Sequence, residues 1–580
     1  MTIHPSFSGR PLCLTVLLLL AACSPTPSRQ SPSSATDPGS GSSKGIAQPS
    51  RVTIAIGAEV NSLATKFEGG NTYASEFHFM TNSPLTLKDG RGALSPLLAQ
   101  DIPSRENGTW TVNPDGTMTT IWRVKPNAKW HDGLAVSASD FVFAFTVYTT
   151  EALAIRDREP EQFMERVERV DDHTFLIRWK QPYPWANELG ARQLEALPEH
   201  IMGRLYEAGD YEAFLNHSFW SSTSYVGNGP FALTQWDPGS QLVYRAFGDY
   251  FMGRPKIDEV VFRIIPDGNT VVANILGGNV DATVGITLGQ QAGVNIKQQW
   301  ASAGAGEVIV NPVRWRYTQI QFDPARSQQP ALSDVRVRRA ILHGIDRATL
   351  AEIVTEGTAG IAEVPVTPGD ARYGAIDAAV VKHPYDPSRS FALLQEAGWT
   401  RRGETIVNAT GQPFAVEVRT TQASDNESEM GIMSADLRKL GLQITQTVVP
   451  QSRIRDAEYR VTFPGLNNTA QSIDVPGTLL VATSDQCAMQ ERRFIGSNRG
   501  CWKNAEFDRL YLAASTSLDA AERDRAFLGA VKILTEEVGI FGLSYNSENL
   551  AVRKGLVGPG ARWPAQIGNT WNIHEWRWTL

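Results

Sequence analysis

The sequence predicts an α/β fold divided among several domains. A chain of 580 residues is longer than one compact core holds, and the usual domain size of about 100 to 200 residues suggests two to four domains. Strand patterns and helix patterns alternate along the chain, and that order favours α/β sheets. With 42% hydrophobic and 20% charged residues, the composition is typical of a soluble globular protein. The formal net charge of −7 argues against a nucleic-acid surface, which needs clustered Lys and Arg.

The first 22 residues have the pattern of a cleaved secretory signal. They contain Arg10 and an apolar run, Leu12–Leu20, that is too short to span a bilayer. Leu20-Ala21-Ala22-Cys23 resembles a bacterial lipobox, in which Cys23 is diacylated and becomes the new N-terminus. The alternative is an ordinary signal with a chance cysteine. Residues 23–50 then form a tether, because Ser, Pro and Gly dominate them and large apolar side chains are almost absent.

The folded part begins with a short strand, Val52–Ile56, which leads into a polar loop containing Glu59 and Asn61. Further on, Gly227-Asn228-Gly229-Pro230-Phe231 makes a loop of permissive backbone that enters a strand. Pro238-Gly239 marks the hairpin after that strand.

A strand, a tight turn and a capped helix are predicted between these segments. Residues 124–129 form the strand and lead to Trp130, whose bulk needs burial. Residues 131–133, His-Asp-Gly, supply the turn, since Asp bonds its own backbone and Gly takes positive φ. Ser137 is placed as a helix N-cap with Asp140 three residues after it, a variant of the capping box. An aromatic-rich helix follows without Gly or Pro.

Residues 310–322 alternate apolar and polar side chains, which is typical of a half-buried strand and places a crossover into a second lobe here. Helices are then predicted at 334–347, 386–398 and 433–441, followed by one long amphipathic helix that runs from Trp502 to about Val538. Strands are expected at 444–449 and 540–545. The arginines at 336, 338 and 339 are interpreted as a solvated helix face paired with local acids.

These segments, in this order, resemble the family 5 extracytoplasmic solute-binding proteins, the peptide and nickel receptors of ABC importers. The resemblance is carried by the Lys-Trp-x-Asp-Gly signature at 129–133, the Gly-rich loop at 227–231, the passage 276–282 and the Asp-x-Arg-Val-Arg-x-Ala helix beginning at Asp334. It implies a two-lobed periplasmic-binding-protein fold with an extra inserted subdomain in the first lobe and with hinge strands joining the lobes. The implied boundaries are 51–92 for the first part of lobe I, 93–190 for the inserted subdomain, 191–312 for the second part of lobe I, 313–542 for lobe II and 543–580 for the return to lobe I.

The resemblance also implies a function. Such a protein captures an oligopeptide-like solute between two lobes and delivers it to an ABC permease, here as a monomer held outside a membrane by its lipid. The predicted ligand-binding residues come from loops that the family topology brings together: Glu59, Asn61, Tyr225, Asn228, Arg314, Trp315, Asn467, Asn468 and, if the loop register differs, Asp474. Trp315 also fits a core position, and Asn468 also fits a turn cap.

The nature of the ligand depends on residues 463–474. Peptide-binding relatives commonly hold the α-ammonium group of the peptide with an Asp in this stretch, whereas Asn467 and Asn468 stand where that acid is expected. The neutral side-chain amides of Asn467 and Asn468 can form hydrogen bonds with amide and hydroxyl groups of a ligand. Arg314 could pair bidentately with a carboxylate. We therefore expect an oligopeptide bound through its backbone, or a glycan-like or modified solute without a free amine.

An enzyme is not expected. The sequence has no GxSxG, no HExxH, no Walker loop and no GxGxxG behind a strand, so a secreted hydrolase has no catalytic constellation. A receptor-like accessory or sensor protein without transport, binding a glycan, a lipid or a metal complex, remains the alternative to transport. No cofactor and no metal site are expected.

Two cysteines remain after Cys13 leaves with the signal and Cys23 takes lipid. Cys487 and Cys501 are predicted to pair in an oxidising compartment, with two free buried thiols as the alternative. A zinc site is disfavoured, because neither cysteine has a CxxC partner or a nearby His.

Overall fold

The computed structural model describes residues 50–67, 73–153, 155, 158–454, 456–565 and 568–579. From Pro49 to Leu580 the chain forms one compact unit. The predicted signal, Cys23 and the tether up to residue 49 lie outside the described residues. Within the described ranges, no helix combines the length and the apolar character that a membrane span requires.

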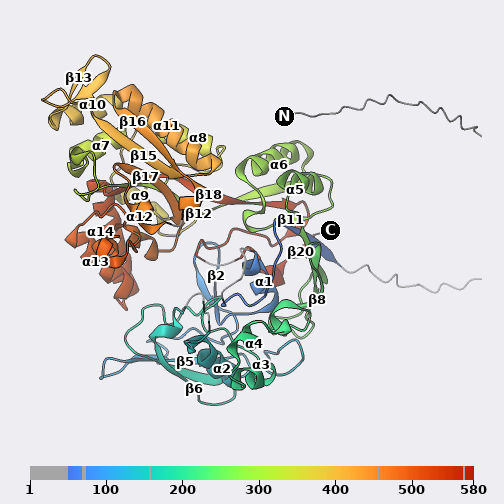
Figure 1. Cartoon of the computed structure of the whole chain (residues 1–580). Coiled ribbons are helices and arrows are strands. Elements are labelled where there is room, and N and C mark those ends of the chain that lie inside the picture. The colour runs from blue at the N-terminus through green and yellow to red at the C-terminus, as the bar shows by residue number, and fades with distance from the viewer. Residues whose placement is uncertain are drawn as a thin grey trace, which may run out of the picture. The chain divides into compact units, whose positions relative to one another are not determined.

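One sheet of ten strands runs through the unit (Figure 1). In spatial order the strands are β16 (Gln443–Val449), β15 (Ala415–Thr421), β17 (Leu466–Ser472), β12 (Gly306–Ile320), β18 (Ile540–Arg553), β11 (Ala282–Thr283), β1 (Arg51–Ile56), β10 (Glu259–Ile264), β9 (Gln241–Ala246) and β8 (Phe231–Asp237). We call the half-sheet from β11 to β8 with its helices lobe I, and the half-sheet β17-β15-β16 with its helices lobe II. The predicted strands at 52–56, after 227–231, at 444–449 and at 540–545 are confirmed.

The two longest strands, β12 and β18, belong to both lobes. They pair antiparallel from Gly306 opposite Arg553 to Gln319 opposite Ile540. At one end β18 pairs with β11 of lobe I, and along its second half β12 pairs with β17 of lobe II. The pairing of β12 with β18 is irregular between Pro312 and Arg314, where one lobe gives way to the other.

Helices cover both faces of the lobe II half-sheet. One face packs against α7 (Val335–His343), α8 (Arg347–Val354), α10 (Pro387–Glu396) and α11 (Ser424–Leu440), and the other against α9 (Tyr373–Ala379), α13 (Ala505–Thr516) and α14 (Ala520–Glu537). The predicted half-buried character of residues 310–322 holds up to Arg314, which is exposed, and is wrong beyond it. Arg316, Thr318 and Gln319 are all at most 3% exposed, because helices lie over both sides of β12.

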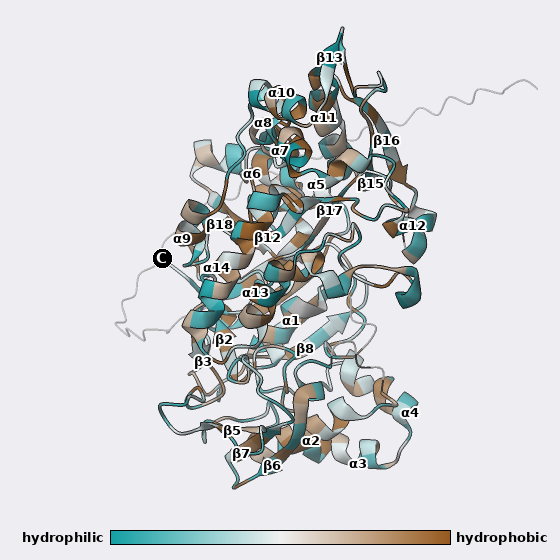
Figure 2. Cartoon of the chain, turned by 90° about the vertical axis from the view of Figure 1, so that its left-hand side faces the viewer, coloured by the Kyte–Doolittle hydropathy of each residue, from teal (hydrophilic) through white to brown (hydrophobic). Residues whose placement is uncertain are grey.

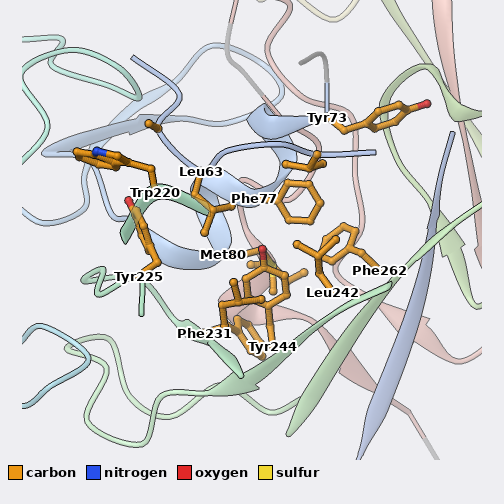
Figure 3. Packing of buried hydrophobic residues seen from close by; sticks show 14 of the residues in the cluster. Leu63, Tyr73, Phe77, Met80, Trp220, Tyr225, Phe231, Leu242, Tyr244 and Phe262 are labelled. Atoms are coloured by element: carbon orange, nitrogen blue, oxygen red, sulfur yellow. The ribbon is translucent and has the colours of Figure 1, made fainter. Parts of the chain in front are cut away.

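Lobe I has a core on each face of its half-sheet. One core lies against α1 (Ala74–Thr81), α3 (Glu199–Glu207) and α4 (Tyr211–Leu215) and is rich in aromatic rings, with Phe77 4.7 Å from Phe262 and 5.8 Å from Tyr244, measured between ring centroids (Figure 3). The other core lies against α5 (Gly268–Leu276) and α6 (Gln290–Ala303).

A separate four-stranded sheet lies in the chain between β1 and β8. Its strands, in spatial order, are β4 (Trp110–Val112), β5 (Met118–Arg123), β7 (Thr174–Trp179) and β6 (Met164–Arg169), and α2 (Ala138–Thr149) packs on it. Among the described residues, three two-stranded pairs complete the sheets: β2 (Thr86–Lys88) with β3 (Leu94–Pro96), β13 (Thr400–Arg402) with β14 (Thr405–Val407), and β19 (Leu556–Val557) with β20 (Arg577–Trp578). Strand β13 is hydrophilic and exposed at the far end of lobe II (Figure 2).

The capped helix predicted near residue 137 is confirmed. Ser137 and Asp140 form the capping box at the start of α2. The indole of Trp130, which is buried as predicted, donates to the Asp140 carboxylate at 3.3 Å. The strand predicted at 124–129 is wrong: the strand of this region is β5, which ends at Arg123, and Val124 and Lys129 form only isolated bridges. Pro126 has no N–H with which to continue a ladder.

The long helix predicted from Trp502 to Val538 is wrong, because two packed helices, α13 and α14, occupy this stretch. The break comes at 517–519, where Asp519 caps α14 by accepting from the backbone N–H of Glu522 at 3.0 Å. The helices at 386–398 and 433–441 are confirmed as α10 and α11, with Gly441 in the left-handed region.

The arginine face predicted on the helix at 334–347 is only partly solvated. Arg336 pairs with Asp334 at the surface, as predicted. Arg338 is 3% exposed and donates at 2.6 Å to the carbonyl of Glu537, at the C-terminal end of α14. The last carbonyls of a helix lack partners within it and attract a cation, so Arg338 joins two helices and does not face water.

Candidate functional site

The parallel strands of both lobes direct their carboxyl ends toward the middle of β12 and β18. In lobe I, β1 is parallel to β10 and β11, and β11 is antiparallel to β18. In lobe II, β15 is parallel to β16 and β17, and β17 is antiparallel to β12. Since β12 and β18 are themselves antiparallel, β17 and β11 point toward each other. We call the region where these strand ends meet the junction. Ligands of open α/β sheets bind outside the carboxyl ends of the strands, so the junction is the candidate site.

Arg314 lies on β12 at the junction, opposite Ser472, the last residue of β17. Its side chain is exposed, and its guanidinium donates to the carbonyl of Ala470 at 3.3 Å. Farther along β12, Tyr317 is buried, with its ring stacked on Trp315 at a centroid distance of 4.5 Å.

Two further arginines, from other segments of the chain, carry charges that affect the hydroxyl group of Tyr317. Arg460 belongs to α12 (Ala457–Val461), and Arg499 lies in the loop that the Cys487–Cys501 disulfide closes. Burial raises the pKa of Tyr317 to about 12, against the opposing effect of the positive charges of Arg499, Arg314 and Arg460. We call these three side chains the arginine cluster.

The arginine cluster has no carboxylate partner in the described part of the chain. Several ion pairs of lobe II lie in the described part of the chain. They join other side chains to carboxylates, and none involves Arg314, Arg460 or Arg499. Burial lowers the pKa of Arg499 to about 10, and repulsion by Arg460 adds to this effect. Although the Arg314 side chain is exposed, surrounding protein removes part of its water and lowers its pKa, with a further contribution from Arg316. The cluster is thus a concentration of positive charge without a neutralising acid among the described residues.

Arg316, two residues after Arg314 on β12, is paired and buried. Its guanidinium donates to the carboxylate of Glu429 at 2.7 Å and to the side-chain oxygen of Asn426 at 2.8 Å, both on α11. Burial raises the pKa of Glu429, and the charge of Arg316 opposes that rise. This pair joins β12 to α11 within lobe II.

Asp474, just after β17, lies where the two lobes meet. Its carboxylate is at the surface, but surrounding protein removes part of its water and raises its pKa. The charge of Lys88 lowers that pKa, and the charge of Glu188 raises it. Lys88 and Glu188 belong to the first third of the chain. Nearby, the guanidinium of Arg523 lies 4.7 Å from the ring centroid of Trp185, so lobe II contacts residues of the first third at a second point.

The predicted residues of lobe I fall in two places. Glu59 and Asn61 follow β1 at the junction, where Asn61 is exposed and Glu59 accepts from the backbone N–H of Gly239. Tyr225 and Asn228 are buried instead. The Tyr225 hydroxyl bonds the side chain of Asn82, and Asn228 accepts from the backbone N–H of Ser83 at 2.8 Å.

Three predicted residues of lobe II also have partners inside the protein. Trp315 is fully buried and donates to the carbonyl of Ala362 at 3.1 Å, which agrees with the core alternative. Asn468 accepts from the hydroxyl of Thr318 at 2.9 Å. Asn467 is buried on β17 opposite Gln319. Of the predicted set, Arg314 lies within β12 at the junction and Asp474 follows the end of β17, whereas Glu59 and Asn61 follow the end of β1.

Two cavities lie away from these strand ends. One of about 440 Å³ is lined by Tyr148, Arg158, Glu161 and Lys180, and Glu161 is held by Lys66 at 2.7 Å. The other, of about 310 Å³, lies between α10 and the end of α11. In the part of the chain that the structure describes, no group of three or more His, Cys, Asp and Glu side chains is arranged to hold a metal ion.

A family model described as bacterial extracellular solute-binding proteins, family 5 Middle, matches residues 94–484. The chain belongs to this family 5. The resemblance that its sequence motifs carry is confirmed.

Individual family 5 relatives are distant in sequence. The oligopeptide-binding protein AppA of Bacillus subtilis is 25% identical over 455 residues, which cover 77% of this chain and 78% of that protein. The oligopeptide-binding protein of Thermus thermophilus in complex with a pentapeptide has a TM-score of 0.63 at 23% identity and covers 91% of this chain and 96% of its own. NikA of Brucella suis in complex with Fe(III)-EDTA has a TM-score of 0.71 at 18% identity, and the match covers 91% of this chain and 100% of that chain. At these identities the two solved structures concern the fold, and they confirm the predicted α/β fold of two lobes.

Sequence reasoning found Arg314 but missed Arg460 and Arg499. Neither residue lies in the sequence motifs that carry the resemblance, and each is one arginine in a stretch with other charges. The only local signal was that Arg499 lies in the loop between the paired cysteines. The cysteine pair predicts that this loop is closed, but it does not predict which strand the loop packs against.

Proposed function

We propose that this chain is a lipid-anchored receptor that captures an oligopeptide-like solute between its lobes and delivers it to an ABC permease. The observation that carries the proposal is the junction, where the carboxyl ends of both half-sheets meet beside two strands shared by the lobes. Membership of family 5 and the peptide-binding names of relatives such as AppA support the class of solute.

The proposed ligand contacts are the side chains at the junction. Glu59 and Asn61 follow β1, Asp474 follows β17 and Arg314 lies within β12, and the peptide groups of β17 add donors and acceptors. We place the passages between lobes near residues 313 and 543 of the two shared strands. Ligand then favours one arrangement of the lobes to the extent that it binds that arrangement more tightly.

A thermal-shift screen tests the proposed solute. Free peptides, N-acetylated peptides and oligosaccharides are compared, since ligand at 100 times its dissociation constant adds about 2.7 kcal/mol of stability. We expect both kinds of peptide to stabilise the protein and oligosaccharides to leave it unchanged. If only free-amine peptides act, then Asp474 is the anchor, and Asp474→Asn abolishes the shift whereas the exposed control Asp485→Asn does not.

Anchoring and delivery are tested separately. Cys23→Ala should release the protein from the membrane fraction, whereas the control Cys13→Ala, within the predicted signal, should not, because the anchor is the acyl chains on Cys23. Deleting the gene should abolish uptake of a labelled peptide that the purified protein binds. Unchanged uptake would favour the accessory or sensor role over transport.

A further inference from the structure

The turn between α13 and α14 of lobe II reaches the separate four-stranded sheet. We call that sheet, with α2 and the residues packed on it, the four-stranded unit. Leu518 lies in the turn and packs against the apolar core of this unit, to which Trp179, Tyr183 and Leu189 belong. The two helices themselves pack on the lobe II half-sheet. One leucine of lobe II therefore completes the core of a different part of the molecule.

A cation and an aromatic ring form a second contact beside Leu518. The guanidinium of Arg523, on α14, lies 4.7 Å from the ring centroid of Trp185, which packs against the same core. Lys88 lies 6.0 Å from that ring centroid and pairs with Glu188 at 2.5 Å. Burial lowers the pKa of Arg523, and the charge of Glu188 opposes this effect across the contact.

Hydrogen bonds within lobe II fix the shape of the turn. Arg523 donates to the carbonyl of Ser517 at 3.0 Å, and the hydroxyl of Ser517 donates to the carboxylate of Glu522 at 2.7 Å. Together with the N-cap Asp519, these bonds place Leu518 and Arg523 for the contact. Since the bonds do not involve the four-stranded unit, making the contact orders little additional chain.

Lobe II also touches lobe I on its other face. The hydroxyl of Thr358, which follows α8, donates to the side-chain oxygen of Gln290 at 2.9 Å, and Gln290 donates to the carbonyl of Ser547 on β18 at 2.6 Å. Helix α8 and the pair of α13 and α14 cover opposite faces of the lobe II half-sheet. The position of lobe II therefore depends on contacts at both faces as well as on the two shared strands.

The contact of the turn is small. It consists of one partly buried leucine and one pair of a guanidinium with an indole. Parts of a chain that share a large apolar interface move as one body, whereas a small contact permits relative motion. A contact of this size can therefore form and break while both parts stay folded.

We propose that the turn at 517–519 is a latch, in which Leu518 and Arg523 hold lobe II against the four-stranded unit in the protein without ligand. This inference goes beyond the proposed function, because the latch acts before any solute binds. Where the latch already brings the lobes together, a solute has less of the closing free energy to supply. The affinity for solute is then set in part by residues that do not contact it.

Distances between spin labels, measured by double electron–electron resonance, test the latch in the mature protein without ligand. The labels are attached at Glu168→Cys in the four-stranded unit and at Glu404→Cys in lobe II, both exposed. We expect Leu518→Ser to lower the ratio of the shorter to the longer distance about tenfold, because the ratio changes by the factor that the lost apolar contact contributed. Arg523→Gln should lower the ratio less. Unchanged distances in both variants would overturn the inference.

Leu512→Ser is the matched control. Leu512 belongs to the same pair of helices but is 59% exposed, so its substitution should leave the distances as in the wild type. A shift in this control as large as that in Leu518→Ser would overturn the inference. A cooperative melting transition shows that each variant folds, and Arg523→Gln decides the question if Leu518→Ser lacks one.

A double variant tests the partner of the arginine. Trp185→Ala and Arg523→Gln remove the same contact from its two sides, so Trp185→Ala/Arg523→Gln should shift the distances no further than Trp185→Ala alone. Shifts that add would show that Arg523 acts through another group, and they would overturn its part in the latch. The measurement uses no solute, so its failure would leave the proposed function as it stands.

Discussion

Arg314 and Arg316 are two residues apart on one strand, yet they have opposite environments. Arg316 is 3% exposed, and Glu429 and Asn426 satisfy its guanidinium. Arg314 is exposed, donates to a carbonyl, and belongs to a cluster without an acidic partner in the described part of the chain. The difference teaches that a buried charge matched within the protein serves the fold, whereas an unmatched charge at a junction of strand ends is available to a ligand.

The largest expected effect is the loss of the matched pair. Glu429→Ala leaves the buried charge of Arg316 uncompensated and should lower the free energy of unfolding by about 3 to 5 kcal/mol. Urea denaturation measures it. The double variant Arg316→Met/Glu429→Leu removes both charges and should recover most of the loss. A single variant as stable as the wild type would break the comparison, because the pair would then contribute nothing to the fold.

The second effect concerns the loop that carries Arg499. Cys487 and Cys501 are 14 residues apart, and opening a loop of about this length costs roughly 3 kcal/mol in the chain-entropy model. Cys487→Ser/Cys501→Ser should therefore lower the melting temperature. Reductant should do the same to the wild type and nothing more to the variant. An unchanged melting temperature would show that contacts with β12 alone hold the loop.

Lobe I offers a buried carboxylate that is matched in another way. Glu76 accepts from the backbone N–H groups of Asn569 at 2.6 Å and Thr570 at 3.3 Å. Burial raises its pKa to about 8, the nearby charge of Glu548 adds to the rise, and Arg562 opposes it. Glu429 has the charge of Arg316 beside it, whereas Glu76 keeps a proton near neutral pH, and that proton removes the cost of a buried charge.

The raised pKa of Glu76 predicts the direction in which stability changes with pH, and that direction can be measured. Between the unfolded pKa near 4.5 and the folded pKa near 8, the folded state keeps a proton that the unfolded state has lost, so stability falls as pH rises. The contribution approaches about 1.4 kcal/mol per pH unit and ends above pH 8. Glu76→Gln should remove this slope from urea titrations at pH 5 to 8, whereas the exposed control Glu352→Gln should keep it. An unchanged slope in Glu76→Gln would contradict the raised pKa.

The smallest expected effect concerns Arg314, the exposed member of the comparison with Arg316. Arg314→Gln should change the free energy of unfolding by no more than about 0.5 kcal/mol, as surface substitutions usually do. Thermal denaturation without ligand measures it beside Glu429→Ala. A loss of several kcal/mol would mean that Arg314 serves the fold, as Arg316 does.

Local signals in the sequence determined many of the elements. The capping box of Ser137 and Asp140, the hairpin at Pro238-Gly239 and the glycine that ends α11 each depend on neighbours within a few residues. A pattern of that length shows which backbone hydrogen bonds a segment satisfies by itself. Where such a pattern was misread, as in the helix from Trp502 to Val538, the missed signal was again local, the N-cap Asp519.

The tertiary structure alone decided which charges are matched. Glu429 is 113 residues from Arg316, and the cluster joins residues 314, 460 and 499, so sheet order and not spacing brings them together. The same order covers both faces of β12 beyond Arg314, so the polar residues there are buried. The sequence by itself determined the family, several of the strands and several helix caps. Whether an arginine stabilises the fold or faces a ligand depends on the elements packed against it. Its neighbours in the sequence do not predict which elements those are.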